Sequence, residues 1–314
     1  MKARKKKLLL PKWPSGVSVF EVGPRDGLQS EGTVLPIAQR AELILKLIDA
    51  GLKDIEVGSF VKADRIPQLQ DTASVIKEVR AKLGRKSPAQ FWAFIPNEFG
   101  LNQAIENEVN GASFFIATSN TFCLKNINRT QDQILESLAH LFKKARANKI
   151  KSRVYLSTLV HCPYEGPVLP ARVDTLVRKL EDLGASEIVL SDTTGHATPL
   201  SIRKVLDKVL VKLPPKLFAL HLHDTRGLAV ANILESMAYG MKRFDSSIGG
   251  MGGCPYAPGA SGNLSTEDLV YLLRGLKIEK FIDMEKLAEA GLFAESLVGR
   301  KLPSRVLRTF DLTT

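Results

Sequence analysis

Short apolar strands alternate with amphipathic helices along most of the chain. Segments rich in branched and aromatic residues, bounded by glycine, proline or asparagine, predict strands at 17–22, 54–57, 91–95, 113–118, 153–157, 187–190, 217–222 and 243–248. After each strand, apolar residues recur at helical spacing, which predicts helices at 36–50, 67–83, 98–109, 131–148, 171–183, from 199 onward, 228–239 and 266–273. These strand–helix units favour a parallel sheet closed into a (β/α)₈ TIM barrel, with a doubly wound open sheet as the alternative.

Both ends of the chain lie outside the predicted barrel. We expect a basic N-terminal tail at 1–16, the barrel at 17–280 and a C-terminal helical extension packed on the barrel at 281–314. Six lysines and arginines precede the first acidic residue, Glu21, so much of the formal net charge of +11 belongs to the tail. The tail lacks the long apolar segment of a secretory signal.

The composition narrows the class of protein further. With 44% hydrophobic and 25% charged residues, the chain resembles an ordinary globular protein. No apolar run approaches the roughly 18 residues of a membrane span, so we expect a soluble protein without a membrane partner. A nucleic-acid-binding protein would carry basic residues on a folded face, so a basic tail predicts no nucleic-acid partner. The cysteines, Cys123, Cys162 and Cys254, are too few for a disulfide framework, which favours a reducing cytoplasm. The tail is too short for a convincing transit peptide and the last residues are not a peroxisomal address, so we expect a bacterial cytoplasmic protein.

Polar residues gather where the predicted strands end. Arg25 and Asp26 follow the first strand, and Glu56 lies at the end of the second. Asp192 follows the sixth strand, and a glycine-rich segment at 249–263 follows the eighth. In a TIM barrel, the carboxyl ends of the strands and the loops after them form the rim where the chemistry takes place. We therefore expect these residues to converge.

The seventh strand ends in two histidines, His221 and His223, separated by one leucine. Because side chains alternate along a strand, both imidazoles lie on one face. They could bind one metal ion, or they could hydrogen-bond at the strand end without a metal. Asp26 is the carboxylate best placed to complete a two-histidine, one-carboxylate set. An amide oxygen from Asn263 would give a shell of nitrogen and oxygen ligands that suits Mg²⁺ or Mn²⁺, with Zn²⁺ as a further candidate. Such an ion would lower the pKa of a bound substrate hydroxyl.

Two features beside this group suggest acid–base and oxyanion chemistry. Arg25 carries a permanent positive charge that could stabilise an oxyanion, and Glu56 would pair with it; a purely structural ion pair is the alternative. The glycines at 249–263 would let the backbone approach a ligand and move as a lid. Cys254 in this segment could act as an acid, a base or a nucleophile, although a thiol in a loop is often incidental.

Several segments resemble one known family. They are 21–29 (EVGPRDGLQ), 122–128 (FCLKNIN), 162–166 (CPYEG), 221–225 (HLHDT) and the glycine-rich 249–263. Together they are similar to the hydroxymethylglutaryl-CoA lyases of the DRE-TIM metallolyases, from about residue 17 to residue 300. The resemblance implies a (β/α)₈ barrel that uses Mg²⁺ or Mn²⁺ to cleave 3-hydroxy-3-methylglutaryl-CoA, an acyl-CoA, into acetoacetate and acetyl-CoA.

The resemblance also implies a role for individual residues. Around the metal it places Asp26, His221, His223 and Asn263. For substrate binding and catalysis it implies Arg25 at the thioester enolate, Glu56 supporting Arg25, Gln29 at the substrate, and Asp192 and Glu21 in the active site. In the lid it places Gly252, Gly253, Gly259 and Cys254, with Cys254 taking part in proton transfer.

Two positions depart from the family pattern. His161 stands where the family often has glycine, and Arg226 stands where it often has an aromatic residue. Pocket size or acyl preference could therefore differ, and a lyase for a longer 3-branched 3-hydroxyglutaryl-CoA or a Claisen-condensing relative is the alternative. We expect a homo-oligomer, a dimer or a tetramer, without a thiol cross-link between subunits, because no cysteine follows Cys254.

Overall fold

The computed structural model describes residues 13–62, 64–84, 87–253 and 262–310. Eight parallel strands close into a barrel in the order β1-β10-β9-β8-β5-β4-β3-β2, which confirms the predicted (β/α)₈ TIM barrel. The strands are β1 (Ser18–Glu21), β2 (Asp54–Ser59), β3 (Gln90–Phe94), β4 (Gly111–Ala117), β5 (Lys151–Ser157), β8 (Glu187–Asp192), β9 (Phe218–Leu222) and β10 (Arg243–Ser246). A short hairpin lies in the loop after β5 and consists of β6 (His161–Cys162) and β7 (Gly166–Pro167).

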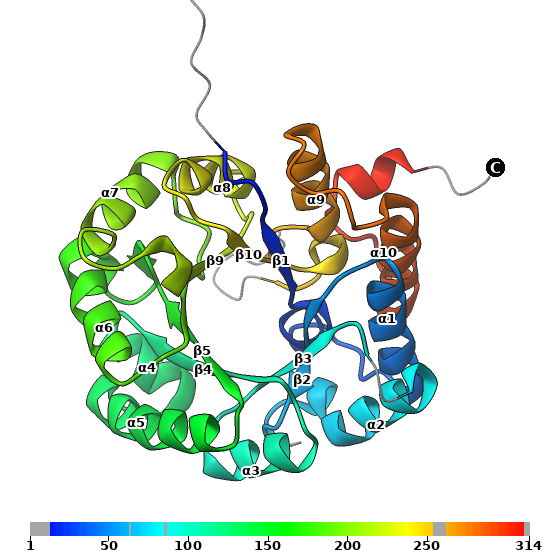
Figure 1. Cartoon of the computed structure of the whole chain (residues 1–314), viewed down its shortest axis with the longest axis horizontal. Helices are drawn as coiled ribbons and strands as arrows, with labels where there is room; N and C mark the ends of the chain where they lie inside the picture. Colours follow the sequence, from blue (N-terminus) through cyan, green and yellow to red (C-terminus); the bar gives the residue numbers. More distant parts are fainter. Residues whose placement is uncertain (1–12, 63, 85–86, 254–261, 311–314) are drawn as a thin grey trace, which may run out of the picture.

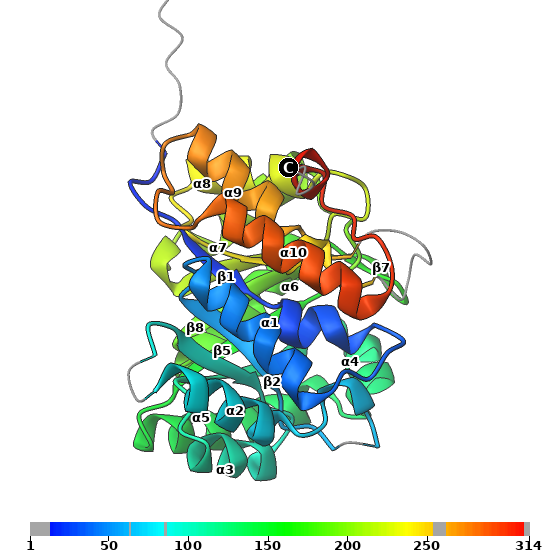
Figure 2. The ribbon, with the colours of Figure 1, turned by 90° about the vertical axis from the view of Figure 1, so that its right-hand side faces the viewer.

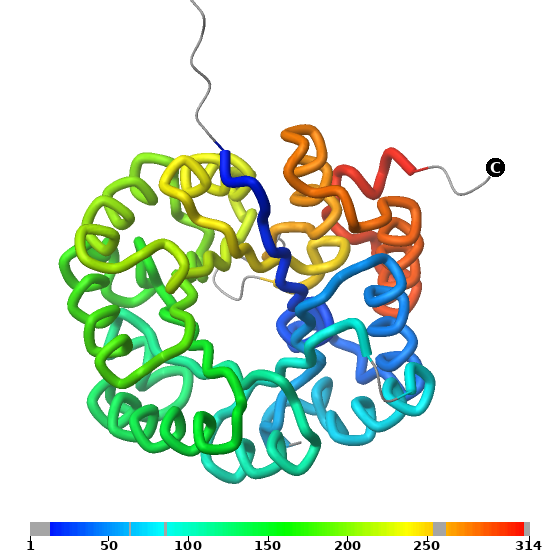
Figure 3. The backbone as a smooth tube through the Cα atoms, viewed as in Figure 1, coloured from blue at the N-terminus to red at the C-terminus, as the bar shows by residue number. Residues whose placement is uncertain are grey.

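Helices form an outer ring around the strands (Figure 1). The chain winds once around the barrel, so that its first and last helices meet (Figure 3). The helices are α1 (Ile37–Asp49), α2 (Thr72–Leu83), α3 (Glu98–Glu106), α4 (Asn120–Ile127), α5 (Gln131–Ala147), α6 (Pro170–Asp182), α7 (Pro199–Val209), α8 (Ala229–Ala238), α9 (Thr266–Gly275) and α10 (Met284–Val298). Short 3₁₀ turns occupy Pro67–Leu69, Pro215–Leu217, Ile248–Gly250 and Val306–Thr309.

Two helices differ from the sequence prediction. The second helix begins at Thr72 and not at residue 67, because Pro67–Leu69 forms a separate turn and Asp71 has a left-handed backbone with φ of 58°. The segment between β4 and α5, where the residue pattern predicted no helix, contains α4. Ser119 caps the first turn of α4 by accepting a backbone hydrogen bond, a local interaction that short helices need.

The barrel interior contains buried charged side chains as well as apolar ones. Tyr155 of β5 contacts Glu56 of β2, and Arg153 of β5 contacts Asp245 of β10. Strand β5 is three positions away from both β2 and β10 around the barrel, so these contacts cross the interior. They join opposite walls of the barrel below its mouth.

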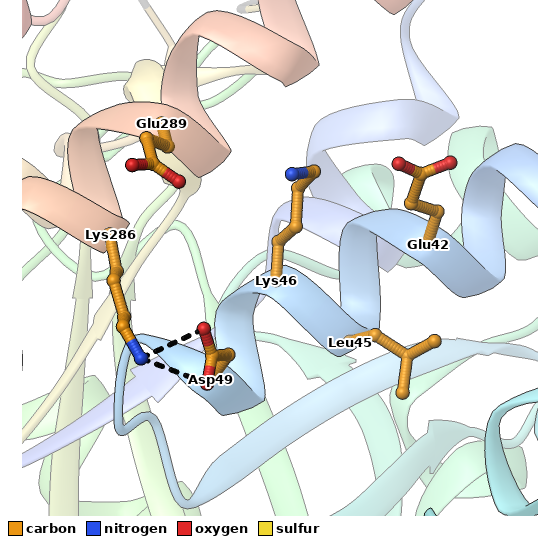
Figure 4. Close-up of a pocket in the computed structure, with 6 residues that line it drawn as sticks. All are labelled: Glu42, Leu45, Lys46, Asp49, Lys286 and Glu289. Carbon is orange, nitrogen blue, oxygen red and sulfur yellow. Dashed lines mark hydrogen bonds and ion pairs between the residues drawn. The ribbon is translucent and has the colours of Figure 1, made fainter. Parts of the chain in front are cut away.

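The C-terminal part of the described chain packs on the outside of the barrel. Figure 2 shows α10 lying beside α1. The backbone N–H of Asp283 donates to the carbonyl of Ala50 at 2.8 Å, and Lys286 Nζ lies 3.0 Å from Asp49 Oδ2 (Figure 4). The hollow in Figure 4 belongs to this outer helix surface. Among the described residues, no helix is both long enough and apolar enough to span a membrane.

Candidate active site at the barrel mouth

The chain makes a wide helical turn at Gly23–Gly27, directly after β1. The carbonyl of Val22 accepts hydrogen bonds from the backbone N–H groups of Arg25 at 3.1 Å and Asp26 at 2.7 Å. A Cβ atom at residue 27 would lie 2.8 Å from Ser247 Oγ, so glycine lets this turn pack closely against the segment after β10. The turn thereby presents Arg25 and Asp26 side by side at the carboxyl end of the barrel.

Asp26, His221 and His223 form the centre of the site. One ligand atom from each of these residues lies within 4.8 Å of the others. His221 Nε2 is 3.9 Å from Asp26 Oδ2, and the two imidazole centroids are 5.4 Å apart. The turn after β1 and the end of β9 thus bring Asp26 together with two histidines that follow it by almost 200 positions in the sequence.

The chemistry of these groups fits a divalent cation. Burial and the neighbouring His221 lower the pKa of His223 to about 4, despite the charge of Asp26, so the imidazole of His223 is neutral. Burial would raise the pKa of Asp26, but the positive charge of Arg25 holds it well below its usual range. His223 Nδ1 is buried and has no hydrogen-bond partner in the described part of the chain. Two imidazole nitrogens and one carboxylate form a ligand set that leaves positions open for a substrate.

Asn263 reaches the same group from the segment after β10. Its backbone pairs with that of His223, and its Nδ2 donates to Asp26 Oδ2 at 2.9 Å and to the carbonyl of Met251 at 3.2 Å. The amide of Asn263 therefore contacts the carboxylate of Asp26 directly. Its oxygen is of the type that Mg²⁺ prefers.

Arg25 and Glu56 form a buried ion pair beside this centre. Arg25 Nε donates to Glu56 Oε2 at 2.5 Å, and Arg25 Nη1 donates to Asp26 Oδ1 at 2.5 Å. Burial acts to lower the pKa of Arg25, but the two carboxylates hold it above its usual range. The guanidinium also lies over the rings of Phe94 and Tyr155, at 5.1 and 5.2 Å from their centroids. Arg25 is thus a fixed positive charge whose orientation is set on several sides.

Asp192 is the last residue of β8. Its Oδ1 accepts the backbone N–H of His196 at 3.1 Å, and its Oδ2 accepts that of Ala197 at 2.7 Å. Burial nevertheless raises the pKa of Asp192 to about 6. This carboxyl can therefore exchange a proton near neutral pH.

Glu21 lies beneath the site and holds backbone in place. Its carboxylate accepts the backbone N–H groups of Gly23 at 2.7 Å and Ile248 at 2.9 Å, and the hydroxyl of Thr266 at 2.6 Å. Burial raises the pKa of Glu21 to about 7. These contacts tie the turn after β1 to the start of the segment after β10, so the structure gives Glu21 a supporting position and not a ligand position.

The remaining residues predicted for the site lie partly at the rim of the barrel and partly outside the residues that the structure describes. Gln29 is exposed, two residues after the wide turn. Gly252 has φ of +114°, and a Cβ atom on it would lie 2.7 Å from Asn263 Nδ2. Gly253 follows it. Cys254 and Gly259, predicted for the lid, lie outside the described residues.

The two positions that depart from the family pattern lie together at the rim, with a third residue that the sequence did not reveal. The rings of His161 and His196 stack with centroids 4.0 Å apart and an interplanar angle of 15°. Arg226 Nη2 donates to His196 Nε2 at 3.0 Å, and Arg226 Nη1 donates to the carbonyls of Thr194 and Gly195 at 2.9 and 3.0 Å. Arg226 thus holds together the loops after β8 and β9.

Sequence reasoning also missed Tyr155 and Asp245, which stand directly behind the site. Tyr155 Oη donates to Glu56 Oε2 at 3.1 Å, and Asp245 Oδ2 lies 3.3 Å from His221 Nδ1. The alternation of side chains places Tyr155 on the same face of β5 as Arg153, which was a usable signal. Asp245 gave no comparable signal, because one acidic residue within a strand also fits a solvent-facing position.

The fold and the site define a class of protein: (β/α)₈ barrels with a group of residues that could hold a metal ion at the carboxyl ends of their strands. Within that class, the chain belongs to the HMGL-like family, whose model matches residues 16–293. The relatives below are carbon–carbon lyases.

The chain is 40% identical over 298 residues to hydroxymethylglutaryl-CoA lyase YngG of Bacillus subtilis, which covers 95% of this chain and 98% of that protein. It is 42% identical over 294 residues to the mitochondrial hydroxymethylglutaryl-CoA lyase of Bos taurus, covering 94% and 89% of the two chains. The crystal structure of the Bacillus subtilis HMG-CoA lyase matches with a TM-score of 0.92, 40% identity and coverage of 96% and 99%. An HMG-CoA lyase from Acinetobacter baumannii in complex with coenzyme A and 3-methylmalate matches with a TM-score of 0.88, 34% identity and coverage of 97% and 98%.

Proposed function

We propose that this protein cleaves 3-hydroxy-3-methylglutaryl-CoA into acetoacetate and acetyl-CoA with the help of a divalent metal ion. The observation that carries the proposal is the convergence of Asp26, His221 and His223 beside the Arg25–Glu56 pair. Similarity to hydroxymethylglutaryl-CoA lyases over more than nine-tenths of the chain supports this substrate. The relative bound to coenzyme A and 3-methylmalate supports an acyl-CoA in particular.

In this proposal Asp26, His221 and His223 would hold Mg²⁺ or Mn²⁺, together with the amide oxygen of Asn263. Nitrogen ligands also suit Zn²⁺, so metal analysis of the purified protein has to identify the ion. When bound, the ion would supply Lewis acidity that lowers the pKa of the substrate hydroxyl. The neutral imidazole of His223 and the ionised carboxylate of Asp26 are already in the protonation states that metal ligation requires.

The other residues of the site would direct the proton and the developing charge. Cleavage removes the proton of the tertiary hydroxyl, breaks the bond between C2 and C3, and leaves the electron pair on the thioester enolate. Asp192, with its pKa raised to about 6, would accept the hydroxyl proton. Arg25, held by Glu56, would stabilise the enolate oxygen. A proton delivered to C2 completes acetyl-CoA, and family resemblance suggests Cys254 as its donor.

The proposal is tested by incubating the purified protein with the thioester and Mg²⁺ and measuring acetoacetate and acetyl-CoA. Detection of neither product would refute the substrate assignment. Asp26→Asn and His221→Ala should each weaken Mn²⁺ binding by at least about 100-fold, because each removes a direct ligand while the barrel still folds. Asp132→Asn, on the exposed first turn of α5, is the matched control. Unchanged Mn²⁺ affinity in both site variants would contradict the ligand assignment.

A lyase for a longer 3-branched 3-hydroxyglutaryl-CoA is the second candidate. The rim cluster of His161, His196 and Arg226 supports it, because this cluster adjoins Asp192 through the backbone N–H of His196. Comparing kcat/KM across acyl chains of increasing length separates the two candidates.

We also propose a reducing compartment such as a bacterial cytoplasm, since Cys123 and Cys162 are both buried free thiols.

A further inference from the structure

A chain of hydrogen-bonded side chains runs through the barrel interior and connects two of the proposed metal ligands. It passes through Asp26, Arg25, Glu56, Tyr155, Arg153, Asp245 and His221. The two ends of this chain, Asp26 and His221, face each other at 3.9 Å. The side-chain contacts therefore form a ring that closes between Asp26 and His221.

In the half of this ring nearer to Asp26, the contacts reach strand β5 at Tyr155. The Tyr155 hydroxyl donates to Glu56 Oε2 at 3.1 Å and accepts from Arg153 Nη1 at 3.3 Å. Glu56 in turn accepts from Arg25 Nε. Tyr155 thus joins the Arg25–Glu56 pair to the buried guanidinium of Arg153.

The other half consists of Arg153, Asp245 and His221. Arg153 Nη2 donates to Asp245 Oδ1 at 2.6 Å, and Arg153 Nη1 donates to Asp245 Oδ2 at 3.1 Å. This two-point contact fixes the plane of the carboxylate. Asp245 Oδ2 then lies 3.3 Å from His221 Nδ1. His221 is thereby held from behind by a carboxylate whose own orientation is set.

Arg153 is a rigid support for this arrangement. Its side chain is fully buried, its guanidinium lies 3.7 Å from the centroid of the Phe20 ring, and Glu187 Oε1 accepts from its Nε at 2.7 Å. A buried guanidinium is stable only when its donors are paired, so Arg153 needs both Asp245 and Glu187. If Asp245 turned away, Arg153 Nη1 and Nη2 would both lose their carboxylate partner.

The position of Asp245 determines which nitrogen of His221 carries the proton. A carboxylate between an arginine and an imidazole can only accept, so Nδ1 of His221 must be the protonated nitrogen. In the neutral imidazole, the lone pair then lies on Nε2, and Nε2 is the atom that faces Asp26. An imidazole with the opposite tautomer would present an N–H to the site and could not bind a cation there.

We propose that Asp245, anchored by Arg153, is a positioning residue that holds His221 in the tautomer and orientation needed for metal binding through Nε2. This inference rests on the proposed metal-ligand set. It assigns to the barrel interior a function that goes beyond stability, because the same ion-pair network orients a ligand.

The first test uses the unmodified, metal-free protein labelled with ¹⁵N-histidine. Long-range ¹H–¹⁵N correlation spectra distinguish the two tautomers, and His221→Gln assigns the signals. We expect His221 to be protonated on Nδ1 and unprotonated on Nε2. A spectrum showing the proton on Nε2 would overturn the proposal, whether or not any variant folds.

The second test compares Asp245→Asn with Glu187→Gln. Both remove one buried carboxylate partner of Arg153, but only Asp245 contacts His221. In Asp245→Asn, the amide oxygen would accept from Arg153 and the amide NH₂ would face His221 Nδ1, so the tautomer should invert. We expect the Kd for Mn²⁺ to rise by about 10- to 100-fold in Asp245→Asn. In Glu187→Gln it should change by less than about twofold, although both variants lose stability.

The outcomes separate this inference from the proposed function. Equal Mn²⁺ affinity in the two variants would overturn the role of Asp245, even if the enzyme cleaves the thioester. If the unmodified protein binds no Mn²⁺, the ligand set of the proposed function fails. The tautomer measured in the metal-free protein still decides whether Asp245 orients His221.

Discussion

Gly252 lies against Asn263 and against the backbone of Asp26, two of the proposed metal ligands, and Gly252→Ala should disturb them. Its φ of +114° lies in a region that residues with a side chain rarely adopt. A Cβ atom would also lie 2.7 Å from Asn263 Nδ2, well inside an ordinary contact of 3.4 Å. The amide would have to move by about 0.7 Å, the difference between these two distances. That movement would break its hydrogen bond to Asp26, which is 2.9 Å long.

Two contributions set the expected magnitude. The backbone strain should cost about 2 kcal/mol, and loss of a hydrogen bond to a charged group should cost about 2 kcal/mol more. We therefore expect the free energy of unfolding to fall by roughly 4 kcal/mol. Displacement of Asn263 should also raise the Kd for Mn²⁺ by at least about 10-fold.

Gly253→Ala is the matched control in the same segment. Among the described residues, a Cβ atom on Gly253 would meet only the side chain of Ser30, at 3.7 Å, and the φ of Gly253 lies outside the region that favours glycine. Urea unfolding and Mn²⁺ titration of both variants provide the comparison. If Gly252→Ala and Gly253→Ala lose the same stability and the same metal affinity, the close approach to Asn263 does not matter and the reasoning is refuted.

Two further predictions concern the charged residues of the site. Arg25→Lys should lower kcat/KM by about 10²- to 10³-fold with the fold intact, because an ammonium group cannot donate to Glu56 and Asp26 in the same fixed geometry. A loss of kcat/KM below about threefold in a thioester cleavage assay would contradict this prediction. Burial raises the pKa of Glu21 from 4.5 to about 7, so the folded state binds the extra proton and the free energy of unfolding should fall as the pH rises through that interval. Glu21→Gln cannot ionise and should show a smaller fall between pH 5 and pH 8 in urea unfolding, whereas Glu78→Gln, on the half-exposed surface of α2, should behave like the unmodified protein. An unchanged fall in Glu21→Gln would contradict the assignment.

The alternation of apolar and polar positions was sufficient to predict the barrel. Each strand and each helix must bury one face, and that requirement is written locally in the residue pattern. The segment at 67–83 shows the limit of this reasoning. Its apolar residues keep helical spacing throughout, but the left-handed backbone of Asp71 separates the turn at 67–69 from α2. Element boundaries depend on such single-residue conformations, whereas the existence of an element depends on many residues together.

The sequence also indicated which polar residues meet, since strand ends share one rim in a barrel. Arg25, Asp26, Glu56, His221 and His223 could be grouped on this ground alone. The tertiary structure decided how they are supported. Contacts of Asp245 and Arg153 with partners on distant strands depend on the stagger and closure of the barrel, which a local pattern does not encode. The sequence therefore determined the composition of the site, and only the closed barrel determined the orientation of its side chains.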